Sequence, residues 1–118
     1  MDQPTGRQTA TGETTLDDWR RQIDALDTEL LRLLNQRAAI ACEIAVVKVA
    51  SGLPAYDGNR ESQVLARVAE KNTGPLDQQS VTAIFRGIIG ETRRLGTQRM
   101  QEQSGKAAVR SQESAGRR

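Results

Sequence analysis

The feature that most constrains the fold is a long apolar stripe at helical spacing near the start of the chain. Its members follow one another at steps of three and four residues, interrupted once at Arg37: Leu16, Trp19, Ile23, Leu26, Leu30, Leu33, Ile40, Ile44 and Val47. Such heptad-like spacing predicts one continuous amphipathic helix. No proline or glycine occurs in this stretch before Gly52 and Pro54, at which the helix should end.

A helix of this length needs a large apolar surface to pack against. About 35 residues at ~1.5 Å each form a rod of roughly 50 Å. The remaining sequence predicts only a short helix at about 59–72, after a turn-rich loop at 52–59, and a medium helix at about 77–97 that begins at Asp77. No strand pattern is visible. We therefore predict an all-α fold of long, short and medium helices that pairs with a second copy of itself.

The two ends of the chain differ from the middle. Residues 1–15 and 99–118 are polar and poor in large apolar side chains, which is typical of disordered tails, so the folded domain is predicted at 16–98. The net charge is only +2, and Trp19, Tyr56 and Phe85 are the only aromatic residues. A nearly neutral domain with so few aromatic rings is a poor candidate for nucleic-acid binding.

The residue types that are missing exclude several kinds of chemistry. The chain has no histidine and one cysteine, Cys42, which excludes Ser-His and Cys-His catalysis, the usual zinc sites and an internal disulfide. We expect Cys42 to be a small buried helix residue. No apolar run approaches the ~20 residues of a membrane span, and the N-terminal residues lack a signal-peptide core, so a cytoplasmic location is expected.

One position of the apolar stripe is charged. Arg37 stands between Leu33 and Ile40, where the spacing requires an apolar residue. An arginine at a helical seam can set the register or extend to solvent, or it can persist because a bound anion completes it. Lys48 follows about three helical turns later on nearly the same face, with the small Ala41 between them. Together the two cations predict a site for a small anion.

Further polar residues have both a structural and a functional interpretation. Arg20 lies ~25 Å along the helix from Arg37, too far for both to hold one small ligand in the same chain. In an antiparallel pair of long helices, however, Arg20 of one copy can approach the middle of the other; otherwise it is an exposed surface arginine.

Polar residues of the two shorter helices carry similar ambiguity. Asp57, Arg60 and Glu61 share one face of the short helix, which fits either a cap with a surface ion pair or part of a site. Thr92 interrupts the apolar stripe of the medium helix, and a threonine there commonly bonds back to its own helix.

With these positions identified, residues 16–95 resemble the all-helical chorismate mutase family. The resemblance is carried by WRRQIDALDTELLRLLNQRAAIACEIAVVK, PAYDGNRESQVLARV and LDQQSVTAIFRGIIGETRRL, and the polar positions follow the family's spacing without a gap. It implies an intertwined homodimer without a cofactor or metal, which converts chorismate to prephenate by a Claisen rearrangement. That reaction belongs to the shikimate pathway, at the entry to phenylalanine and tyrosine biosynthesis.

The resemblance also implies a role for each matched residue. Arg37 and Arg20 of the partner subunit would hold the two carboxylates of the substrate, and Lys48 would donate a hydrogen bond to its ether oxygen. Asp57 would accept from the ring hydroxyl. Arg60 and Glu61 would complete the wall of the site, and Thr92, where the family often has serine, would assist a carboxylate. Lys48, Arg37 and Glu61 are thus the candidate catalytic residues.

One departure from the family pattern limits this assignment. The family commonly has glutamine or glutamate four residues after the Thr92 position, acting with the lysine on the ether oxygen, whereas this chain has Gly96. Gln98 lies ~120° further round a regular helix, so it can replace the missing donor only if the helix unwinds. We therefore expect a weaker enzyme, one completed by a partner protein, or one with a shifted substrate.

Two other interpretations remain open from the sequence. The first is a related pericyclic enzyme, either a 4-amino-4-deoxychorismate mutase or a lyase that releases pyruvate from isochorismate; the residues Asp57, Arg60 and Glu61 favour the hydroxyl-bearing substrate. The second is a helical dimerisation or adaptor module without catalysis. That module would explain the apolar stripe equally well but would leave Arg37 without an anion.

Overall fold

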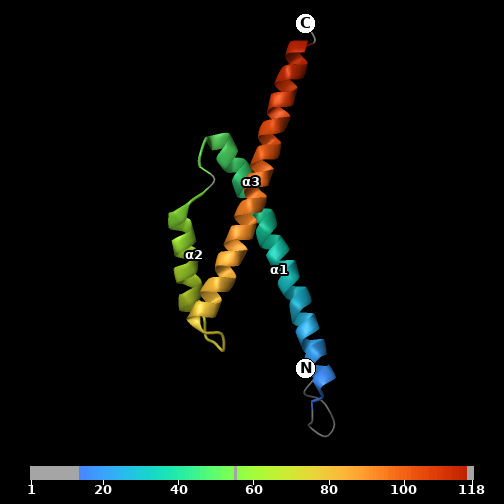
Figure 1. Cartoon of the computed structure of the whole chain (residues 1–118), viewed down its shortest axis with the longest axis vertical. Coiled ribbons are helices and arrows are strands. Elements are labelled where there is room, and N and C mark those ends of the chain that lie inside the picture. Colours follow the sequence, from blue (N-terminus) through green and yellow to red (C-terminus); the bar gives the residue numbers. More distant parts are fainter. Residues whose placement is uncertain (1–13, 55, 117–118) are drawn as a thin grey trace. The chain divides into compact units, whose positions relative to one another are not determined.

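The structure, a computed structural model, describes residues 14–54 and 56–116, without the side chains of 103, 104 and 106–116. Three helices follow one another: α1 (Leu16–Ser51), α2 (Gly58–Lys71) and α3 (Gln78–Gly116) (Figure 1). No strand occurs in this described part of the chain, so the all-α prediction is confirmed. The expected N-terminal tail, 1–15, lies almost entirely outside the described residues.

The start of α1 is fixed by a reciprocal pair of hydrogen bonds. The backbone N–H of Asp18 donates to Thr15 Oγ1, and the backbone N–H of Thr15 donates to Asp18 Oδ2, both at 3.1 Å. This capping box satisfies two N–H groups that the first turn leaves without intrahelical partners. Accepting the Thr15 bonds lowers the pKa of the Asp18 carboxyl.

The end of α1 is set by glycine geometry. Gly52 has a φ of +69°, in the left-handed region that glycine adopts without a steric penalty. Its N–H donates to Val49 O at 3.2 Å, and the N–H of Leu53 donates to Lys48 O at 2.9 Å. These two bonds form a Schellman motif. The predicted end of the long helix is therefore confirmed at the residue that the sequence indicated.

Aspartates begin both of the following helices. Asp57 caps α2 by accepting the backbone N–H of Arg60 at 3.1 Å, and Asp77 caps α3 by accepting that of Ser80 at 2.7 Å. Between them, Asn72 closes the turn through a side-chain bond to Leu76 O at 2.8 Å. The predicted boundaries of the short helix and the start of the third helix are thus confirmed within about two residues.

The third helix is longer than predicted. The sequence placed its end near residue 97, whereas α3 continues to Gly116. The prediction relied on the loss of the apolar stripe, but the polar residues that follow include no proline and are mostly good helix formers. Loss of amphipathicity ends packing against a core without ending the helix. That 99–118 is a tail independent of the domain stays a prediction.

The chain divides into two compact units, Met1–Gln36 and Arg37–Arg118. In the first, the apolar stripe of α1 is at least half exposed at every position from Leu16 to Leu33. In the second, α2 packs against α3 (Figure 1), and the most buried side chains are Cys42, Ala45 and Val81. The expectation that Cys42 is a buried helix residue is confirmed. Among the described helices, none has the apolar length needed to cross a membrane.

Candidate active site

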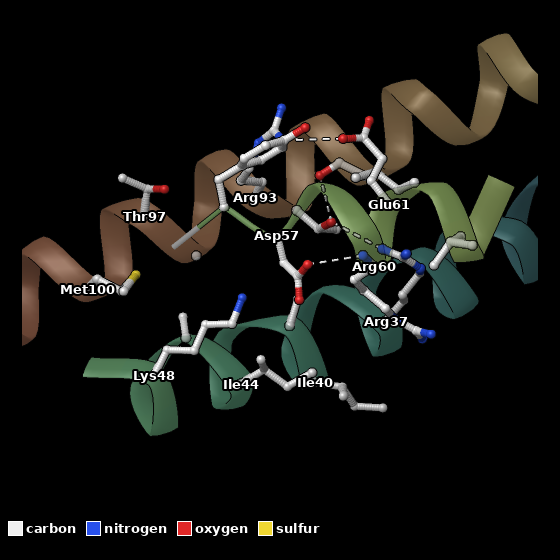
Figure 2. A pocket seen from close by; sticks show the side chains of 17 residues that line it. Arg37, Ile40, Ile44, Lys48, Asp57, Arg60, Glu61, Arg93, Thr97 and Met100 are labelled. Carbon is white, nitrogen blue, oxygen red and sulfur yellow. Dashed lines mark hydrogen bonds and ion pairs between the residues drawn. The ribbon is translucent and has the colours of Figure 1, made fainter. Parts of the chain in front are cut away.

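A cavity of about 270 Å³ lies within the second unit, between the C-terminal part of α1, the start of α2 and the middle of α3. Figure 2 shows that its charged side chains come from all three helices. Six of the seven positions singled out in the sequence line it: Arg37, Lys48, Asp57, Arg60, Glu61 and Thr92. The structure therefore brings together residues from separate segments of the chain.

The floor of the cavity is one face of α1. Arg37 and Lys48 lie at its two ends, as their spacing predicts, and Ile40, Ala41, Ile44 and Ala45 line the cavity between them. Two of these four intervening side chains are single methyl groups. The two alanines leave room for a small molecule between the cations, and the two isoleucines give it an apolar surface.

Arg37 is anchored by α3. Its Nη1 donates a hydrogen bond to Thr92 Oγ1 at 3.1 Å, in a half-buried environment. The Thr92 hydroxyl in turn is within hydrogen-bonding distance of the carbonyls of Ile88 (2.9 Å) and Ile89 (3.1 Å), to which it can donate. Its proton is thus directed along α3 while a lone pair faces the guanidinium. The sequence interpretation of Thr92 as back-bonded to its own helix is right but missed this second role.

The start of α2 supplies the opposite wall. Asp57, Arg60 and Glu61 all line the cavity, and the cap at Asp57 fixes the first turn through Arg60 N and through Glu61 N, which donates to Asp57 O at 3.1 Å. The two interpretations offered by the sequence are therefore compatible, because the same residues cap the helix and face the cavity. The Glu61 carboxylate pairs with Arg93, at 3.7 Å from Nη1 to Oε1.

Sequence reasoning missed Arg93 and Tyr56. Arg93 lines the cavity from α3, and its guanidinium carbon lies 4.7 Å from the centre of the Tyr56 ring, a cation–π arrangement. Its position directly after Thr92 was the available signal. The sequence interpretation followed only the apolar stripe of α3 and did not consider the position next to it. The cavity is lined by residues at both positions, Thr92 and Arg93.

At Gly96, α3 lies close to α1. A Cβ built on it would lie 3.5 Å from the Ala45 Cβ and 4.0 Å from Ala41 O, which is ordinary contact. Because α3 is continuous through this residue, the unwinding that would redirect Gln98 does not occur, and Gln98 does not line the cavity. The cavity therefore lacks a polar side chain at position 96.

The cavity carries an excess of positive charge. Four cationic and two anionic side chains line it: Arg37, Lys48, Arg60 and Arg93, against Asp57 and Glu61. A surplus of two positive charges suits a ligand with two negative charges. Among the described residues, no group of three or more histidines, cysteines or carboxylates is placed to hold a metal ion.

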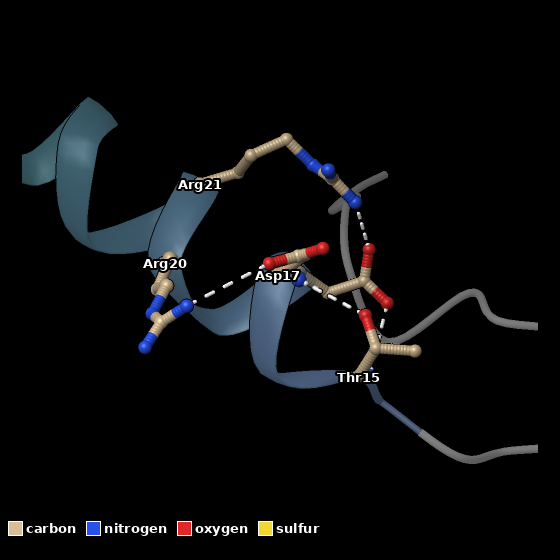
Figure 3. A network of polar contacts seen from close by, with 5 residues as sticks. Thr15, Asp17, Arg20 and Arg21 are labelled. Carbon is tan, nitrogen blue, oxygen red and sulfur yellow. Dashed lines mark hydrogen bonds and ion pairs between the residues drawn. The ribbon is translucent and has the colours of Figure 1, made fainter.

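Arg20, the seventh predicted site residue, belongs to the first unit. Its Nη1 lies 3.9 Å from Asp17 Oδ1, and its side chain is 68% exposed (Figure 3). An ion pair this long and this exposed contributes little to stability, so the Arg20 guanidinium can exchange its partner at little cost. That Arg20 completes the cavity of a second subunit stays a prediction.

Comparison with known proteins links this geometry to one family. The sequence profile of the family described as chorismate mutase type II matches residues 19–97, more than half of the chain. A chorismate mutase structure from Thermus thermophilus is similar with a TM-score of 0.69 and 30% identity, covering 70% of this chain and 93% of that one.

Curated relatives include both short and long proteins. A bifunctional chorismate mutase/prephenate dehydratase from Neisseria gonorrhoeae is 42% identical over 72 residues, covering 61% of this chain but only 19% of the relative. A chorismate mutase from Methanocaldococcus jannaschii is 27% identical over 88 residues, covering 74% of this chain and 89% of that protein. The chain thus spans about a fifth of the length of the bifunctional relatives it matches.

Proposed function

Because the chain belongs to the chorismate mutase type II family, we propose that its cavity binds chorismate and converts it to prephenate. The observation that carries the proposal is the surplus of two positive charges around a cavity of about 270 Å³, with Arg37 held in place by Thr92. Chorismate is a small dicarboxylate, so its charge and size match this cavity.

The rearrangement requires few chemical groups from the protein. A pericyclic step breaks one carbon–oxygen bond and forms one carbon–carbon bond within a single molecule, without a nucleophile, a general base or a metal. The protein must fold the enolpyruvyl arm over the ring and place positive charge where the ether oxygen gains electron density. A chain without histidine can meet both requirements with arginine and lysine alone.

In the proposed site, different residues bind the carboxylates, stabilise the ether oxygen and border the ring. Arg37, together with Arg20 of the partner subunit, holds the two carboxylates, and Thr92 keeps the Arg37 guanidinium in position. Lys48 donates to the ether oxygen, where charge develops in the transition state. The remaining residues of the set form the α2 wall, with Asp57 accepting from the ring hydroxyl and Arg60 and Glu61 bordering the substrate.

The homodimer in this proposal is supported by the exposed stripe of α1. In the first unit Leu16, Trp19, Ile23, Leu26 and Leu30 are each 51–62% exposed in the single chain. Large side chains aligned on one helix face, in heptad-like spacing, are typical of a surface that a second helix covers. An intertwined pair would bury this stripe and bring Arg20 of one chain toward the cavity of the other.

Direct assay of the purified chain tests the proposal. Ultraviolet absorbance should show chorismate disappearing, with prephenate identified as the product, and parallel assays with 4-amino-4-deoxychorismate and isochorismate separate the related pericyclic reactions. If chorismate persists at micromolar enzyme, with and without added cell extract, the mutase proposal is wrong.

A substitution at Arg37 separates the enzyme from the adaptor interpretation. Removing one preorganised donor typically costs about a hundredfold in rate, so Arg37→Leu should lose turnover to that extent. The matched control is Arg67→Leu, at an exposed position of α2 that does not line the cavity, and it should retain turnover. An adaptor would instead gain stability from Arg37→Leu and show no turnover in any variant.

A further inference from the structure

The Arg93 side chain makes two contacts at the edge of the cavity, one with an aromatic ring and one with a carboxylate. Its guanidinium lies over the Tyr56 ring at 4.7 Å and pairs with the Glu61 carboxylate at 3.7 Å (Figure 2). The Arg93 side chain is 40% exposed and that of Glu61 22%. The Arg93 guanidinium therefore contacts both Tyr56, which precedes the cap of α2, and the Glu61 carboxylate in the first turn of α2.

The Tyr56 ring is also in close contact with Gly58. A Cβ added to Gly58 would lie 3.1 Å from Tyr56 Oη and 3.3 Å from Cε2, tighter than most Cβ contacts. The ring therefore lies directly against the first residue of α2, in space that a larger residue would occupy. Arg93 and Gly58 together determine where the ring stands beside the cavity.

The Glu61 carboxylate needs such a partner for an electrostatic reason. It lines a cavity proposed to hold a dianion, so an uncompensated carboxylate there would repel the ligand. The pair with Arg93 is half-exposed and adds little to the stability of the fold. The pair instead affects ligand binding, because without Arg93 the excess of positive charges around the cavity would drop from two to one.

We propose that Arg93 is a positioning residue of the active site, which holds the Glu61 carboxylate and the Tyr56 ring and offsets the charge of Glu61 toward the substrate. The inference rests on the proposed function, since it assumes that the ligand is the dianion chorismate. Arg93 acts through Glu61 and Tyr56 rather than on the reacting atoms. Its loss should weaken binding of substrate and transition state equally.

Kinetics of the full chain test the electrostatic part. Arg93→Met should raise KM for chorismate about five- to tenfold with kcat nearly unchanged, and Arg93→Lys should recover most of the loss. The matched control is Arg94→Met, one position further on α3, where the arginine pairs with Glu91 and does not line the cavity. It should leave KM at the wild-type value.

The coupling to Glu61 gives a second kinetic test. In a Glu61→Gln background no carboxylate remains to be offset, so Arg93→Met should raise KM much less than it does in the wild type. An equal rise of KM in both backgrounds, or the same rise with Arg94→Met, would overturn the proposal. Such results would mean that Arg93 acts through the general charge or stability of α3.

The contact with Tyr56 can be tested without turnover. Tyr56 is the only tyrosine of the chain, so protein with isotope-labelled tyrosine gives a single set of ring signals in NMR spectra. Arg93→Met should shift these signals and Arg94→Met should not; unchanged signals in Arg93→Met would overturn the inference. If the signals shift as expected but wild-type protein leaves chorismate intact, the proposed function is wrong, and the Arg93–Tyr56 contact is retained.

Discussion

Replacing Thr92 by valine should weaken the proposed reaction by releasing Arg37. Valine keeps the branched shape of threonine but lacks the hydroxyl that accepts from Arg37 Nη1 at 3.1 Å. The guanidinium would stay charged and half-buried with one N–H left to find another acceptor. Because Arg37 is proposed to grip a substrate carboxylate, its orientation is what the substitution perturbs.

The size of the effect follows from the contact. A hydrogen bond to a charged group contributes about 1.5–3 kcal/mol, and the lower value applies because both side chains are half-buried and water can partly replace the hydroxyl. About 1.4 kcal/mol corresponds to a tenfold change in kcat/KM. Stability should change little, because the Thr92 bonds to Ile88 O and Ile89 O engage carbonyls that the helix already uses.

The assay compares kcat/KM for chorismate in a double-mutant cycle. Thr92→Val should lose about tenfold, and Thr92→Ser, which keeps the acceptor, should stay near the wild type. In an Arg37→Leu background Thr92→Val should have almost no further effect, since its partner is gone. Full activity of Thr92→Val, or the same loss in both backgrounds, would refute the proposed anchoring of Arg37.

Two further substitutions test the helices that frame the cavity. Gly96→Ala should raise the free energy of unfolding by about 1 kcal/mol or more, because alanine favours the helix and the new methyl would contact Ala45 Cβ at 3.5 Å. Gly87→Ala, whose methyl meets nothing within 4 Å among the described residues, should give the helix-propensity part alone; equal gains in urea unfolding would show that the contact at Gly96 adds nothing. The hydrogen bond from the Ser80 N–H lowers the pKa of the Asp77 carboxyl in the folded protein. The stabilisation that this cap provides is therefore complete above the ordinary pKa of 3.8, and it is lost as the pH falls through the lowered pKa of the folded state. Asp77→Ala should therefore lower Tm more at neutral pH than below about pH 3, and Asp77→Asn should lower it less at neutral pH; a loss from Asp77→Ala that is the same at both pH values would contradict the assigned cap.

The sequence by itself determined where most helices begin and end. Gly52, Asp57 and Asp77 mark boundaries through hydrogen bonds that reach only three to five residues along the chain. Such bonds depend on local residue type, so they can be read without knowledge of the fold. The continuation of α3 to Gly116 was missed because the prediction took the loss of apolar periodicity beyond residue 97 as the end of the helix.

The spacing of Arg37 and Lys48 was also readable, because both stand on one regular helix. The resemblance to a family added Asp57, Arg60, Glu61 and Thr92 as candidates. The resemblance also implied that these residues share one substrate site, but their contacts within the cavity depend on how separate helices pack.

Only the tertiary structure decided the partners within the site. Arg37 and Thr92 are 55 residues apart in sequence, and Arg93 meets Glu61 and Tyr56 only because α3 packs against α2. The close approach of Gly96 to Ala45 likewise exists only where α3 meets α1. Helix periodicity fixes which face a residue occupies, but the neighbour across that face is set by the packing of whole helices, which no local pattern encodes.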